Sequence, residues 1–212
     1  MIKYISLMLC LACLLTGCAG EPEMGVVNPM KEMASLDDIN AAAGTEIQKP
    51  QAFRITNEEF FIINSDVPVA DYRFSIGDAK YTFRAAKTYD DISGVYGDAE
   101  RLTRWYKGDV QYSLYVQNGS DGEMRAIAAE QAPAFYPVVE EISNGYMTVL
   151  PNEGTPERVS SDRIIVKIQH TDPSKEPLPG DVVEITYNGE ILESYPAELG
   201  EIYSIRVMMP VM

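Results

Sequence analysis

The sequence has few of the residues on which most catalytic and metal sites depend. Among its 212 residues there is one histidine, His170, and the three cysteines all stand within the first 18 positions. A Ser-His-Asp or Cys-His site needs a histidine as its base, and zinc sites normally use several cysteine and histidine ligands. Three prolines follow His170 within ten residues, which predicts an exposed position where a strand ends. The sequence therefore argues against a histidine-dependent hydrolase and against a zinc enzyme.

Basic residues and phosphate-binding motifs are also scarce. There are 17 basic residues against 32 acidic ones, which gives a net charge of −15. A surface with this charge repels nucleic acid and anionic lipid headgroups, so no nucleic-acid partner is expected. Neither G-x-x-x-x-G-K-[ST] nor G-x-G-x-x-G occurs, so no nucleotide site is indicated. The chain is 46% hydrophobic and 23% charged, which is typical of a globular protein.

The apolar run at the N-terminus, residues 4–15, is too short for a membrane-spanning helix, which needs about 20 apolar residues. Lys3 precedes the run and small residues follow it, a pattern typical of a secretory signal peptide. Cleavage after such a signal leaves Cys18 as the only cysteine, so the mature chain has no intramolecular disulfide. An exported protein with a single thiol is easiest to understand if that thiol is blocked.

The segment Leu15-Thr16-Gly17-Cys18 resembles the lipobox of bacterial lipoproteins, in which a leucine and two small residues precede a cysteine. The resemblance implies cleavage before Cys18, a diacylglycerol on its thiol and a fatty acyl chain such as palmitate on the new amino group. Stable anchoring needs more than one acyl chain, and this arrangement supplies it. We therefore expect a signal peptide over residues 1–17, a lipidated tether over 18–34 and a place on the extracytoplasmic face of the cell membrane. The alternative is an ordinary secretory signal with an incidental cysteine.

Local patterns predict one helix followed by antiparallel strands. Ser35 is a good N-cap, Gly44 is a natural C-terminal stop, and the residues between them place apolar side chains on one face. From Phe53 onward, alternation with period two predicts half-buried strands, joined by hairpin turns at 77–78 and 107–109. Residues 124–131 are predicted to form a second short helix.

Pro133 and Pro137 interrupt any regular element and predict a boundary between a domain over 35–131 and another over 135–212. In the second domain, the Asn-Gly pairs at 144–145 and 188–189 predict hairpins. Five or six short strands in about 75 residues predict a small OB-like β-barrel. The expected fold class is α+β, mostly antiparallel β, with a short helix and a sheet first and the barrel second.

Two longer stretches resemble known groups of bacterial proteins. The segment NPMKEMASLDDINAAAG, with FIIN, YTFRAAK and DDISGVYG, is similar to clostridial and related lipoproteins that carry a domain of unknown function, over residues 28–130. The segment GDVVEITYNGEILESYPAELGEIYSIRV resembles the end of a small β-barrel domain of unknown function from bacterial envelope proteins, over residues 135–212. Neither resemblance implies an active site, so it assigns no functional residue beyond Cys18.

One acidic loop, residues 89–100, is a candidate Ca²⁺ site. Its oxygen ligands would be Asp90, Asp91, Asp98 and Glu100. Carboxylates are ligands that Ca²⁺ prefers, although their spacing does not match an EF-hand loop. The alternative is a solvated loop in which aspartate and glycine shape the turns.

A second group of candidates is aromatic. The candidate ligand-binding residues are Trp105, Tyr106, Tyr115 and Tyr195. Such rings stack on sugars or peptides, but tyrosine and tryptophan also favour half-buried positions in sheets. The alternation of the strands favours an outward-facing position for Tyr106 and Tyr115. For Tyr195 the alternative to ligand binding is packing against the barrel.

These patterns favour a non-catalytic binding, accessory or sensor module of the cell envelope. Its expected partners are the membrane, through the lipid, and an envelope protein or glycan. No cofactor is expected apart from the covalent diacylglycerol on Cys18. A bound Ca²⁺ ion at the acidic loop is the other option left open. Two other functions stay open: a carboxylate-based hydrolase of cell-wall glycans, since acidic pairs are abundant, and an inhibitor of exported proteases that uses the 171–180 loop or a hairpin tip as bait.

The lipobox gives a direct prediction. Cys18→Ala should abolish labelling of the protein by a fatty-acid probe and should leave the signal uncleaved by the lipoprotein peptidase, because no thiol remains to receive the diacylglycerol. Labelling and gel mobility in cells measure both. A variant that is still labelled and anchored would contradict the lipoprotein interpretation.

Overall fold

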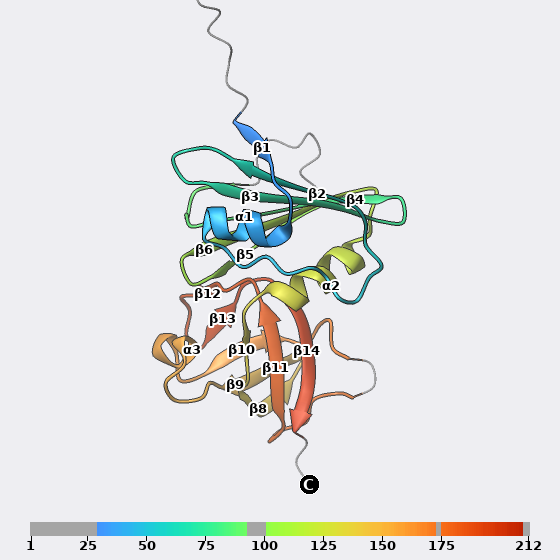
Figure 1. Ribbon diagram of the computed structural model, residues 1–212. Coiled ribbons are helices and arrows are strands. Elements are labelled where there is room, and N and C mark those ends of the chain that lie inside the picture. Colours follow the sequence, from blue (N-terminus) through green and yellow to red (C-terminus); the bar gives the residue numbers. More distant parts are fainter. Residues whose placement is uncertain (1–28, 93–100, 173–174, 210–212) are drawn as a thin grey trace, which may run out of the picture.

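The computed structural model describes residues 29–92, 101–172 and 175–209, which form two β-sheets and three short helices (Figure 1). It is 15% helical and 46% strand, and nearly all strand pairings are antiparallel. This confirms the predicted fold class, α+β and mostly antiparallel β. In Figure 1 the first sheet and the second sheet lie at opposite ends of the molecule.

The first sheet has six strands in the order β1-β2-β3-β4-β6-β5. Its strands are β1 (Met30–Glu32), β2 (Thr56–Ile63), β3 (Val69–Ile76), β4 (Ala79–Ala86), β5 (Leu102–Lys107) and β6 (Val110–Gln117). Gly77 and Gly108 take φ values of 57° and 63° in the turns between β3 and β4 and between β5 and β6. Both predicted hairpins are therefore confirmed, and two-residue turns set the register of each.

Two helices pack on one face of this sheet. Helix α1 (Leu36–Ala43) begins where the Asp38 N–H donates to the Ser35 hydroxyl, 3.2 Å away, and ends at Gly44 with a φ of 66°. Helix α2 (Asp121–Gln131) begins at a capping box formed by Ser120 and Glu123. Both predicted helices are confirmed. Helix α2 begins three residues before the predicted start because the capping box satisfies its first N–H groups.

The second sheet curls into a half-barrel. Its strands are β7 (Ala134–Phe135), β8 (Val138–Ser143), β9 (Tyr146–Leu150), β10 (Ile164–Lys167), β11 (Val182–Tyr187), β12 (Ile191–Leu192), β13 (Ala197–Leu199) and β14 (Ile202–Met209), with helix α3 (Pro156–Ser160) between β9 and β10. The order is β12-β13-β10-β9-β8-β11-β14, and β7 also pairs with β11. After β10 the chain runs beside β14, where Thr171 and Ile205 form an isolated parallel β-bridge. That bridge brings the two sides of the sheet together, as in a partly open OB barrel.

The two Asn-Gly pairs behave differently. Asn144 and Gly145, with φ values of 52° and 80°, join β8 to β9 in the predicted hairpin. The hairpin predicted at Asn188-Gly189 is wrong, because β11 pairs with β14, β8 and β7 while β12 pairs with β13. The Asn188 N–H donates to the Glu201 carbonyl, and the Asn188 carbonyl accepts from the Tyr106 N–H. The backbone N–H and C=O groups of Asn188 are therefore hydrogen-bonded to residues far along the chain and do not close a hairpin.

The two sheets have separate hydrophobic cores, and Tyr203 of β14 links them. Its side chain is 2% exposed and belongs to the core of the first sheet, where its ring meets the edge of Trp105 with centroids 6.1 Å apart. Its hydroxyl donates to the Arg104 carbonyl at 3.0 Å and lies 2.8 Å from the Thr103 hydroxyl. Burial raises the pKa of the Tyr203 hydroxyl, so the group stays a donor. The division into two domains at Pro133 stays a prediction.

A second contact between the first sheet with its helices and the half-barrel involves His170, the only histidine of the chain. His170 is exposed, as predicted, and its Nε2 lies 3.1 Å from Arg125 Nη1 on α2. Partial burial, and then the neighbouring Arg125, lower the pKa of His170. The neutral ring accepts the arginine hydrogen bond, so His170 serves here as a link between α2 and the half-barrel.

The Tyr203 contact predicts how the sheets hold together. Tyr203→Phe keeps the ring but removes the hydroxyl hydrogen bonds, so the free energy of unfolding should fall by about 1–2 kcal/mol. Tyr203→Ala should lower it by about 3–5 kcal/mol, because the whole ring is lost from the core. Denaturant unfolding followed by circular dichroism measures both. Tyr146→Phe, at an exposed tyrosine, is the control, and equal effects of Tyr203→Phe and Tyr146→Phe would contradict the assignment.

Candidate functional site

The face of the first sheet that points away from α1 and α2 is mainly polar, although Phe61 and Leu102 share its phase. Along β3, β4 and β6 the residues of one phase pack with the helices, and the residues of the other phase point to the opposite side. We call this second surface the polar face. It comprises Glu59, Asp71, Arg73, Ser75, Lys80, Thr82, Arg84, Arg104, Tyr106, Gln111, Ser113, Tyr115 and Gln117. It holds four of the 17 basic residues of an acidic chain, so its charge differs from that of the rest of the surface.

Asp71 is the centre of the polar face. Its side chain is 0% exposed, and its two oxygens accept from Arg73 Nε and from Arg84 Nε, each at 2.7 Å. Arg84 lies directly opposite Asp71 in the register of β3 and β4. A buried carboxylate is costly unless charged hydrogen bonds compensate it. Because each of its oxygens accepts a guanidinium hydrogen bond, Asp71 holds Arg73 and Arg84 in place on this face.

The segment after β4 folds back over one end of the polar face. The Ile92 N–H donates to the Gln111 side-chain oxygen at 3.1 Å, and the Gln111 amide donates to the Tyr106 hydroxyl at 2.8 Å. Tyr89 stacks on Tyr106 with centroids 6.2 Å apart. Asp91 pairs with Arg104 at 3.0 Å. These contacts attach residues 88–92 to the β5–β6 side of the sheet.

The other end of the polar face is open and forms a cavity of about 430 Å³. Its walls come from β2, β3, β4 and β6 and mix charged, amide and hydroxyl groups, among them Glu59, Arg73, Lys80, Thr82, Tyr115 and Gln117. Asn57 contributes to the rim, where β2 has an irregular register and Asn57 takes a φ of 53°. The volume falls within the range of small-molecule sites.

The structure separates the predicted aromatic candidates. Tyr106 and Tyr115 lie half-buried on the polar face. Trp105 is 0% exposed and stacks on Tyr112 within the core, so it is inaccessible to a ligand and its role is packing. Tyr195 is 83% exposed between β12 and β13, on the other sheet. Its predicted alternative, packing against the barrel, does not occur.

The structure describes only part of the candidate calcium loop. Asp90 and Asp91 lie on its described side, and Asp91 pairs with Arg104. Asp98 and Glu100 lie outside the described residues. Within residues 29–92, 101–172 and 175–209, no three acidic, histidine or cysteine side chains cluster in a way that would hold a metal ion. The Ca²⁺ site stays a prediction.

The central residues of the polar face were missed by the sequence reasoning, although a signal for them exists. A two-residue turn at Gly77-Asp78 pairs Ile76 with Ala79, and counting outward from that pair places Asp71 opposite Arg84. Charged residues of opposite sign thus face each other on two predicted strands. Nothing local to the sequence shows that these strands are central in the sheet and that the pair is buried.

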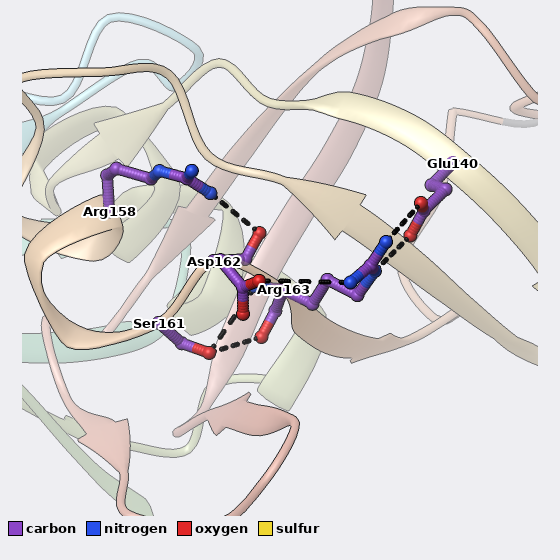
Figure 2. A network of polar contacts seen from close by, with 5 residues as sticks. All are labelled: Glu140, Arg158, Ser161, Asp162 and Arg163. Carbon is purple, nitrogen blue, oxygen red and sulfur yellow. Dashed lines mark hydrogen bonds and ion pairs between the residues drawn. The ribbon is translucent and has the colours of Figure 1, made fainter.

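A second polar network lies on the half-barrel but has the character of a surface contact. Arg163 makes two hydrogen bonds to Glu140 of β8, at 2.7 and 2.9 Å, and Arg158 donates to the Asp162 carbonyl (Figure 2). The hydrogen bond to Glu140 raises the pKa of Arg163. The paired side chains are 45% and 34% exposed, so the pair contributes little to stability. It fastens the loop between α3 and β10 to β8.

Among the described residues, no helix is both long enough and apolar enough to cross a membrane. Comparison with models of known protein families, with curated proteins and with solved structures finds no match. The resemblance to clostridial envelope lipoproteins and to a small envelope barrel therefore stays a prediction.

The ion pairs of the polar face give a prediction about stability. Asp71→Asn should lower the free energy of unfolding by about 3 kcal/mol, because it leaves the largely buried Arg84 without its charged acceptor. Glu140→Gln is the control, since it breaks an exposed pair and should change stability far less than Asp71→Asn does. Denaturant unfolding measures both variants. Similar losses in the two variants would show that burial of Asp71 does not matter.

Proposed function

We propose that this chain is a lipid-anchored, extracytoplasmic binding module of the cell envelope that holds its ligand on the polar face. The observation that carries the proposal is the buried Asp71, which pairs with the largely buried Arg84 and fixes the partly exposed Arg73 beside the open cavity. Well-packed apolar residues in place of a buried ion pair are often as stable or more stable. A charged, ordered network at the centre of a sheet is therefore better explained by recognition than by stability.

The anchor part of the proposal rests on the lipobox sequence. Pro29 is the eleventh residue after Cys18, and an extended chain spans at most about 3.5 Å per residue, so roughly 40 Å separates the lipid from the first described residue at most. The fold therefore stays close to the bilayer. The chain enters it through β1, at the end of the molecule opposite the half-barrel (Figure 1). This arrangement keeps the polar face within reach of ligands near the membrane.

The proposed module is non-catalytic. The central carboxylate of the polar face, Asp71, has both oxygens engaged by guanidinium groups, which is the arrangement of a positioning residue. His170 is held by Arg125 at the contact between the halves, away from the polar face. The proposed role is to bind a ligand and keep it near the membrane.

In-cell photo-crosslinking of the anchored protein tests the proposal. A photo-reactive amino acid in place of Thr82, on the polar face, should give crosslinked species. The same amino acid in place of Thr148, an equally half-buried threonine on β9 of the other sheet, should not. The absence of crosslinks at position 82, or equal crosslinking at both positions, would contradict the polar face as the binding surface.

A further inference from the structure

We infer that the open end of the polar face is a saccharide-binding site. The inference rests on the proposed function, because it names the class of ligand that the polar face holds. Three properties of the cavity carry it: its place in the sheet, the chemistry of its walls and its charge.

The cavity lies on the middle of the sheet and not at an edge. Its walls come from β2, β3, β4 and β6, and the two strands in its middle, β3 and β4, are paired with a neighbour on both sides. The backbone N–H and C=O groups of β3 and β4 are used by the sheet itself, so a ligand over these two strands is recognised by side chains. Extended peptides are usually bound by adding a strand to a sheet edge or by inserting apolar side chains into pockets. The middle of this cavity, over β3 and β4, offers no strand edge.

The side chains of the cavity match a ligand that is rich in hydroxyl groups. Arg73 and Lys80 donate hydrogen bonds, Glu59 accepts them, and Thr82 and Gln117 do both. A sugar hydroxyl is also both a donor and an acceptor, so each wall group finds a complementary atom on it. The half-buried ring of Tyr115 adds an apolar surface of the kind on which the C–H face of a sugar ring packs.

Charge and size narrow the ligand class further. The cavity combines two basic side chains, Arg73 and Lys80, with one acidic side chain, Glu59. A chain with a net charge of −15 repels a polyanion over long distances, and Arg73 and Lys80 oppose a polycation at short range. A volume of about 430 Å³ suits a small ligand or one short stretch of a polymer. A neutral or weakly charged saccharide satisfies all of these conditions.

The test uses the full-length lipoprotein purified in detergent micelles and an array of printed neutral, N-acetylated and acidic oligosaccharides. We expect binding to a subset of the neutral or N-acetylated sugars. Lys80→Ala and Tyr115→Ala should each weaken that binding by about tenfold, the size of one lost hydrogen bond or stacking contact. Lys167→Ala, at an exposed strand lysine of the half-barrel, is the matched control and should leave binding unchanged.

The outcomes separate this inference from the proposed function. Binding to no saccharide on the array, with crosslinks still formed at position 82, would overturn the saccharide site and leave the polar face as a binding surface for another class of ligand. Saccharide binding that Lys80→Ala and Tyr115→Ala do not weaken would place the sugar elsewhere and overturn the inference as well. Circular dichroism of each variant must show the wild-type fold. If Tyr115→Ala unfolds, then Lys80→Ala and Gln117→Ala decide the question, since both residues are exposed.

Discussion

The ion pairs of Asp71 are the constraint on which the first half of the molecule depends. A carboxylate that is 0% exposed must have charged partners, and Arg73 and Arg84 supply them at 2.7 Å from two neighbouring strands. The same alternation puts the aromatic residues of these strands on the opposite face, where α1 and α2 cover them. The helices cannot cover the polar face without burying more charge. One buried acid therefore helps to decide which side of the sheet becomes the core and which side stays polar.

The sequence predicted best the features that depend on neighbouring residues. Ser35 and Gly44 determine the ends of α1, and the glycine turns at 77 and 108 determine two hairpins, because caps and tight turns are satisfied within a few residues. The turn at Asn188 failed for the opposite reason. Its backbone bonds to Glu201 and to Tyr106, and partners so far away along the chain leave no local pattern. The fold class was predictable, whereas the connection between the sheets was not.

The candidate site was predictable only in part. Alternation placed Tyr106 and Tyr115 outward, which is the phase that they occupy. Trp105, which was a candidate ligand-binding residue, lies in the core instead. The two-residue turn at 77–78 sets the register of β3 and β4 and so predicts that Asp71 faces Arg84. Burial of that pair, however, depends on the strands on either side. The cavity lies where β2 has an irregular register, and side chains from four strands line it. These are properties of tertiary structure, and no short stretch of sequence encodes them.

The most direct test of the account is a double-mutant cycle on Asp71 and Arg84. Asp71→Asn, Arg84→Gln and the double variant are compared with the wild type by denaturant unfolding of the full-length chain. The account predicts a coupling energy of at least about 2 kcal/mol, because the two groups pair in a buried setting. A coupling below about 0.5 kcal/mol would show that the two residues act independently and would contradict an ordered polar face built around Asp71.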